Sequence, residues 1–330
     1  MKTLLFIILL YLCNDLVFSQ SQDNKPKNTK THDYITNYYP SVYNAYYEYH
    51  QKNYEETFKL YQKAFEACPP INIGSFNELG LFIRTCAILE KNDLAAEYLK
   101  KVLLTGDELK YYLEDSLLNK VWDTPQGLEI ITNYDDIRAE YISSINMPLR
   151  ERFAMMQSTD QQYRDDTYGY PKEQSDLDKT NAQLLMEIFE KYGYYPNRMI
   201  IGNGCPEGPP TCPSPSDNRL LLHTNDSIKM NYFIPKLQVF VNNGTCNPRI
   251  LGSAIDRIYL NKDEPFIMGT YYDMDENFNT TRAKTIPDLE QVDRNRISIG
   301  LPPLYIQDVY DSIFLGNDWV SNLYKEDTTK

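Results

Sequence analysis

The sequence lacks the motifs that would assign a function directly. It has no Gly-rich phosphate-binding loop, no H-E-x-x-H zinc motif and no G-x-S-x-G nucleophile motif. It also lacks an excess of basic residues, since 33 Lys and Arg stand against 46 Asp and Glu for a formal charge of -13. A chain with this net negative charge repels the phosphate backbone, and its basic residues are interspersed with acids instead of forming a basic patch. We therefore expect no nucleic-acid partner.

Long apolar runs are missing beyond the N-terminus. No later stretch reaches the roughly 20 apolar residues that a membrane-spanning helix requires, so we predict no transmembrane segment. The N-terminus itself combines a charged start at Lys2, an apolar run over residues 4–12 and a small residue, Ser19. This pattern is typical of a signal peptide, which we predict over residues 1–19. The mature protein would then be exported and either periplasmic or extracellular.

Cysteines are few, and five of the six follow the predicted signal peptide. In an oxidising compartment we expect disulfides. One would hold the Pro- and Gly-rich loop between Cys205 and Cys212, while Cys68 and Cys86 either pair or remain buried thiols and Cys246 completes the set. Neither a C-x-x-C pair nor a nearby histidine gives the spacing of a zinc site. We therefore predict no metal site and no cofactor.

The length of the chain and its patterning predict two domains after a polar segment. A chain of 330 residues exceeds the usual size of one domain. Residues 20–35 are polar and lack periodicity, which indicates a flexible leader. Residues 36–146 carry helical patterns and 13 of the 28 tyrosines, which we interpret as packing residues. The second domain is predicted over residues 147–326.

One helical segment of the first domain resembles a tetratricopeptide repeat. Thr57, Tyr61 and Ala64 recur at spacings of four and three, which places them on one helix face before Pro69. They match the small, aromatic, small and proline signature of the second helix of such a repeat, and residues 76–99 form a looser second unit. The resemblance implies a surface that binds a protein or peptide. The alternative is that these helices only support the C-terminal domain, because two units are a short array.

The second domain resembles a bacterial family of unassigned function over about residues 149–304. The resemblance implies a shared fold, and it supplies no catalytic residues. The matching pieces are, in order, Asp160-Gln161 with Arg164, Asp178 with Asn181, the segment 193–196 with Gly202, His223, Asp256-Arg257, Gly269-Thr270, and Arg294-Asn295-Arg296 with Gly300-Leu301.

The candidate catalytic residues are His223, Asp256 and Arg257. His223 precedes a break in the pattern, and a histidine at such a place can act as a general base. Residues 258–260 and 266–271 are rich in strand formers and predict a β-hairpin. This hairpin would bring Asp256 to His223 as an orienting carboxylate, with Arg257 as an anion-binding group.

Five further residues are candidates for binding. Asp160, Gln161 and Arg164 are expected on one helix, where the spacing of four between Asp160 and Arg164 allows an ion pair. Arg294 and Arg296 are expected to approach His223 as anion-binding guanidiniums. The alternative for the whole set is a buried ion network that fixes the hairpin to its helices, because no nucleophile or metal set accompanies the histidine.

The sequence therefore predicts a mainly α protein, with a tetratricopeptide-like helical region followed by an α+β domain that contains a small β-hairpin. Two functions remain open. The first is an exported binding protein of the cell envelope, which engages a protein or peptide through its helical repeats or a ligand through its C-terminal domain. The second is an exported hydrolase-like enzyme centred on His223.

Overall fold

The computed structural model describes residues 33–72, 76–164, 172–203, 213–274, 280–282, 288–316 and 321. The predicted signal peptide, residues 20–32 of the predicted leader, and Cys205 and Cys212 lie outside them. The described residues are mainly helical with one two-stranded sheet, which confirms a mainly α protein. All the described residues belong to one compact unit. The predicted domain boundary falls inside this unit, between the helices α10 (Tyr134–Ser144) and α11 (Met147–Thr159).

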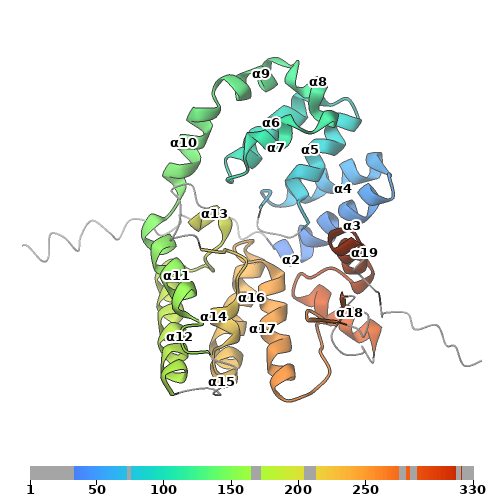
Figure 1. Ribbon diagram of the computed structural model, residues 1–330. Coiled ribbons are helices and arrows are strands. Elements are labelled where there is room, and N and C mark those ends of the chain that lie inside the picture. The colour runs from blue at the N-terminus through green and yellow to red at the C-terminus, as the bar shows by residue number, and fades with distance from the viewer. Residues whose placement is uncertain are drawn as a thin grey trace, which may run out of the picture. The chain divides into compact units, whose positions relative to one another are not determined.

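The first helices pack side by side in chain order (Figure 1). Thr57, Tyr61 and Ala64 are all fully buried, so the face predicted from their spacing is confirmed. Their helix ends at Ala67, two residues before Pro69. The elements are α2 (Tyr34–Asn37), α3 (Tyr39–His50), α4 (Tyr54–Ala67), α5 (Glu78–Ile88) and α6 (Asn92–Leu103).

Short helices continue the chain, and the later ones, α8 to α10, pack against α6, as expected for elements that extend a short array. Thr124 caps one of them by accepting a hydrogen bond from the Gly127 N–H, and Pro125 opens it. The tetratricopeptide resemblance itself stays a prediction. These elements are α7 (Leu109–Leu113), the 3₁₀ turn η1 (Ser116–Leu118), α8 (Asn119–Trp122), α9 (Pro125–Thr132) and α10.

The predicted hairpin is wrong in its position. Residues 258–260 belong to the helix α17 (Pro248–Asn261), which begins where the Asn247 side chain accepts a hydrogen bond from the Arg249 N–H. Apolar residues at helical spacing then bury one face of α17, and this burial outweighs the strand preference of its last turn. The observed strands are β1 (Tyr272–Met274) and β2 (Thr280–Arg282), an antiparallel pair with Tyr272 opposite Arg282.

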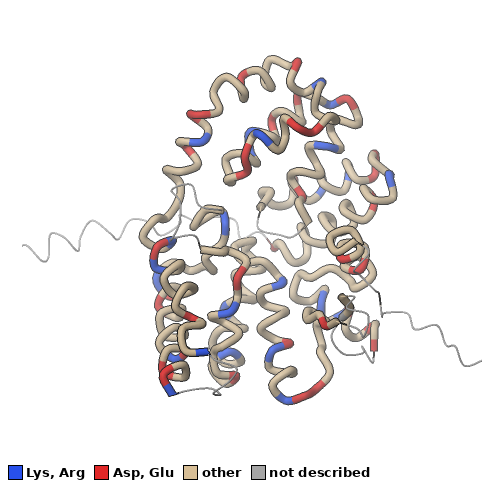
Figure 2. The backbone as a smooth tube through the Cα atoms, viewed as in Figure 1, with Lys and Arg blue, Asp and Glu red and all other residues tan. Residues whose placement is uncertain are grey.

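Two of the remaining helices, α14 and α16, pack against α17. Figure 2 shows basic and acidic residues interspersed along the described chain. Within this part of the chain, no helix is both long and apolar enough to span a membrane. The elements are α12 (Lys172–Tyr192), α13 (Arg198–Ile201), α14 (Arg219–Leu222), α15 (Asp226–Ile228), the π-helical turn η2 (Lys229–Phe233), α16 (Ile234–Asn242), α18 (Leu289–Ser298) and α19 (Leu304–Leu315).

Tyrosines of α3 join the N-terminal helices to the end of the chain. The Tyr43 hydroxyl donates to the Gly300 carbonyl oxygen at 2.7 Å. The rings of Tyr46 and Tyr310 lie 5.9 Å apart, and α3 packs on α19 (Figure 1). Gly300 has a φ of +82°, and a Cβ there would come within 2.9 Å of Tyr39. The chain therefore covers this face of α3 with its own C-terminal helix.

The three described cysteines are free and buried. Of the two alternatives for Cys68 and Cys86, the structure has the buried thiols, and Cys246 is a buried thiol as well. Burial raises the pKa of the Cys86 thiol to about 12. These thiols are therefore unreactive packing groups at neutral pH.

Glu78, in the first turn of α5, is a carboxylic acid buried without full compensation. It is 2% exposed, and its Oε2 has no hydrogen-bond partner among the described residues. Burial raises its pKa from 4.5 to about 7, against the smaller opposing effects of a backbone N–H and of Arg198. Because the unfolded chain ionises first as the pH rises, Glu78 removes stability between about pH 4.5 and 7.

Replacing Glu78 by Gln should therefore stabilise the protein at alkaline pH. We expect the free energy of unfolding to rise by up to about 3 kcal/mol near pH 8, and by less than about 1 kcal/mol near pH 5. Denaturant titrations at the two pH values measure this difference. The exposed Glu66→Gln serves as control. Equal effects of both substitutions at both pH values would show that ionisation of the buried Glu78 does not destabilise the protein.

Candidate functional site

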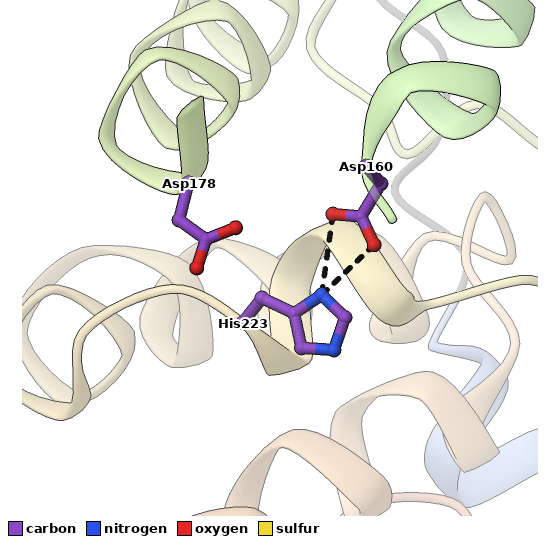
Figure 3. Close-up of side chains that lie close together, drawn as sticks. All are labelled: Asp160, Asp178 and His223. Carbon is purple, nitrogen blue, oxygen red and sulfur yellow. Dashed lines mark hydrogen bonds and ion pairs between the residues drawn. The ribbon is translucent and has the colours of Figure 1, made fainter. Parts of the chain in front are cut away.

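Three ionisable side chains from three helices meet at one point. Asp160 follows the last residue of α11 and is 1% exposed, while His223 follows the last residue of α14. The His223 Nδ1 lies 3.2 Å from Oδ1 and 2.9 Å from Oδ2 of Asp160 (Figure 3). Asp178 comes from the middle of α12, and Figure 3 shows its carboxylate turned toward the other two. One potential ligand atom of each residue lies within 4.8 Å of the others.

Hydrogen bonds from neighbouring residues hold both carboxylates in place. Arg164 Nη2 donates to Asp178 Oδ1 at 2.6 Å. The fully buried Gln174 donates through Nε2 to the same oxygen and to the Asp160 carbonyl oxygen, each at 2.8 Å. Gln161 Nε2 donates to Asp160 Oδ2. Gln174 thus connects the end of α11 to α12 and fixes the separation of the two acids.

The two acids differ in how well their charge is stabilised. Burial raises the pKa of Asp160, but hydrogen bonds from His223 and Gln161 and the charge of Arg164 outweigh it, so this pKa lies below its ordinary value. Burial also raises the pKa of Asp178, and Arg164 and His223 offset this only in part, so this pKa stays above its ordinary value. The charged form of Asp178 is therefore less well stabilised than that of Asp160.

Two buried polar atoms on α12 have no hydrogen-bond partner among the described residues. They are Asp178 Oδ2 and Asn181 Nδ2, on side chains of residues that are 6% and 3% exposed. A spacing of three places both residues on the same side of the helix. Because a buried polar group without a partner costs about 1 to 3 kcal/mol, each needs an explanation.

A polar cavity of about 280 Å³ opens beside His223. Its lining includes the side chains of Arg164, Arg257 and Asp226. Asp226 is paired with Lys229 at 2.9 Å and accepts a hydrogen bond from Asn261 at 2.9 Å. Arg257 makes no ion pair with a described residue, and its Nε has no hydrogen-bond partner there. The cavity wall therefore includes a guanidinium that makes no ion pair within the described part of the chain, although its charge acts on Asp226 and Tyr271.

Five predicted site residues gather here: Asp160, Gln161, Arg164, His223 and Arg257. The predicted pairing of Asp160 with Arg164 along one helix is wrong, because α11 ends at Thr159 and Arg164 binds Asp178 instead. The expectation that Arg257 lies near His223 is met, since both line the same cavity.

Asp256 does not lie at His223 as its orienting carboxylate. Its fully buried carboxylate accepts hydrogen bonds from the N–H groups of Ile267 at 3.1 Å, Met268 at 2.9 Å and Thr270 at 2.8 Å, and from the Thr270 hydroxyl at 2.8 Å. Four donors surround the two oxygens. Asp256 therefore holds the loop after α17 in place, as the alternative of a buried network expects.

The two arginines of α18 also lie elsewhere. Arg296 is 1% exposed and donates to the carbonyl oxygens of Pro302 and Met268 and to Gln307 Oε1. Arg294 lies on the surface with Glu290. Arg296 therefore holds the same loop that Asp256 binds, and neither arginine is among the residues that line the cavity.

Two residues of the cluster were not among the predicted site residues. Asp178 entered only as a piece of the family resemblance, and Gln174 did not enter at all. Both lie on the buried face of α12 at a spacing of four, together with Asn181 and Leu185. Three polar residues on a helix face that is otherwise apolar are the signal that would have identified them.

Comparisons of the chain with protein-family models, with curated proteins and with solved structures give no match. Both resemblances described from the sequence therefore remain predictions.

Asp256 is expected to stabilise the fold and Arg257 is not, and the free energy of unfolding of two variants measures this difference. We expect Asp256→Ala to lower the free energy of unfolding by at least about 3 kcal/mol, because it leaves several buried donors without an acceptor. Arg257→Ala should change it by no more than about 1 kcal/mol, like the exposed control Asp123→Ala. A loss for Arg257→Ala as large as that for Asp256→Ala would assign both residues to one structural network.

Proposed function

We propose that the protein is an exported binding protein whose cavity beside His223 holds the anionic group of a small ligand. One observation carries this proposal: the walls of a cavity of about 280 Å³ include Arg164, His223 and Arg257 together. Guanidinium groups bind carboxylates and phosphates through paired, charged hydrogen bonds. The three acids nearby already have partners, which are His223 for Asp160, Arg164 for Asp178 and Lys229 for Asp226.

In this proposal the helical region is mainly a support for the C-terminal half. Tyr43 and its neighbours on α3 pack against α19 and so occupy a face that a repeat would offer to a partner. A protein or peptide partner stays a second possibility for the segment after α6. Large apolar side chains are exposed there, namely Tyr111, Leu113, Leu117, Leu128, Ile131 and Ile142.

The contact between His223 and Asp160 favours a hydrolase-like enzyme as the alternative function. If Nδ1 donates to the carboxylate, Nε2 is the ring nitrogen that can accept a proton from a substrate or water. The imidazole lines the cavity, so a small substrate would have access to it. Asp160 would orient the ring, which is the role that the sequence had assigned to Asp256.

Anion binding is tested with inorganic phosphate as the probe, by isothermal titration calorimetry on the full chain. Arg257→Gln should raise the dissociation constant at least about tenfold, a loss of about 1.4 kcal/mol. Arg294→Gln is the matched control, because Arg294 lies on the surface with Glu290 and should not matter. Equal phosphate binding by the wild type and Arg257→Gln would reject this function for the cavity.

The enzymatic alternative has its own test. Wild-type protein is incubated with p-nitrophenyl acetate and p-nitrophenyl phosphate, and turnover is followed against pH. If His223 is the base, His223→Gln should lower kcat/KM at least about a hundredfold and remove the acidic limb of the profile. Turnover that His223→Gln leaves unchanged, or turnover no faster than in buffer, would count against the enzyme.

A further inference from the structure

We infer that Asp160, Asp178 and His223 together bind a divalent metal ion. Metal ligands at about 2.0 to 2.3 Å from a common ion lie about 3 to 4 Å from one another. The three candidate ligand atoms already lie within 4.8 Å of one another, and His223 Nδ1 lies 2.9 Å from Asp160 Oδ2. Small side-chain rotations would therefore bring them onto one ion (Figure 3).

The Oδ2 atom of Asp178, which has no hydrogen-bond partner among the described residues, indicates that a ligand completes the cluster. Oδ1 accepts hydrogen bonds from Arg164 and Gln174, whereas Oδ2 is buried and has no partner among the described residues. Asp178 is 6% exposed, so bulk water does not compensate this oxygen. Carboxylates that bind metals show this division, with one oxygen held by outer hydrogen bonds and the other on the ion.

The surrounding residues hold the other ligands in the same way. Gln161 donates to Asp160 Oδ2, and Gln174 ties the Asp160 backbone to α12. Such outer contacts orient metal ligands before the ion arrives. Asp160 and His223 stand at the C-terminal ends of α11 and α14, and Asp178 lies within α12, so three separate helices set the positions of the ligands.

The charge of the cluster suits a doubly charged ion. Two carboxylates and one neutral imidazole would compensate a divalent cation, which in turn removes the repulsion between Asp160 and Asp178. Binding at Nδ1 displaces the proton from this nitrogen, and Nε2 takes up a proton from water, so the ring binds as the other neutral tautomer with no net loss of a proton. No oxidation or bond cleavage is involved.

The donor set favours Mn²⁺, Fe²⁺, Co²⁺ or Zn²⁺ over Ca²⁺. One imidazole nitrogen and two carboxylates suit first-row transition ions, whereas Ca²⁺ takes six to eight oxygen ligands. Three protein ligands leave coordination positions open. His223 and Arg164 also line the cavity, so an anion held by the guanidiniums could occupy one of them. This last step rests on the proposed function, but the metal site itself does not.

The experiment uses the full chain, treated with EDTA and dialysed into buffer without phosphate. Titration calorimetry with Mn²⁺ and Zn²⁺ should show one ion per chain with a dissociation constant below about 10 μM, and binding of Ca²⁺ at least about a hundredfold weaker. Asp178→Asn should weaken Mn²⁺ binding at least about tenfold. Asp176→Asn is the matched control, since Asp176 lies exposed on the same helix beside Lys179.

A second readout keeps the inference testable if a variant is unstable. Co²⁺ bound by the wild type should give visible absorption bands that change in His223→Gln, a variant whose fold is checked by circular dichroism. Absence of one-to-one binding by the wild type, or wild-type affinity in Asp178→Asn, would overturn the metal site.

The two proposals fail independently of each other. Phosphate binding that depends on Arg257 in the presence of EDTA, together with no metal binding, keeps the anion site and removes the metal. Metal binding that depends on Asp178, with no phosphate binding by either the metal-free or the metal-bound protein, keeps the metal and removes the proposed ligand class.

Discussion

A buried carboxylate has to be compensated where it is buried, because its removal from water costs several kcal/mol. Asp256 shows how this chain meets that constraint, with four hydrogen-bond donors around two oxygens. Asp178 is less deeply buried, at 6% exposed against 0% for Asp256, and one of its oxygens has no partner among the described residues. Glu78 also has a buried oxygen without a partner among the described residues, but only Asp178 combines such an oxygen with two further potential ligand residues beside it.

The tyrosine-rich N-terminal helices serve packing more than recognition. Buried tyrosines fill large volumes, and their hydroxyls tie distant segments together, as Tyr38 does by accepting from the Ile71 N–H and Tyr43 by donating to Gly300. These contacts connect α3 to the loop before α5 and to the segment before α19. The helical region is thereby built into the same core as the C-terminal half, which explains why its first face is not free for a partner.

The sequence predicted what depends on local periodicity and missed what depends on where helices end. The spacing of Thr57, Tyr61 and Ala64 identified a buried face correctly, because a regular helix continues through all three. The same reasoning failed for Asp160 and Arg164, since α11 stops at Thr159. It failed again at residues 258–260, where strand formers lie in a helix that Asn247 and Pro248 start eleven residues earlier. The meeting of Asp178 with His223 joins distant segments, and no local period encodes it.

His223 Nδ1 is the atom on which the two chemistries of this site depend. It cannot both donate a hydrogen bond to Asp160 and bind a cation. An acid–base pair of His223 and Asp160 needs no further carboxylate, so it leaves the bare oxygen of Asp178 unexplained. A cation uses that oxygen and relieves the repulsion between the two acids. The unsatisfied oxygen therefore favours the metal over the acid–base pair, and it makes His223 a metal ligand that also lines the anion cavity.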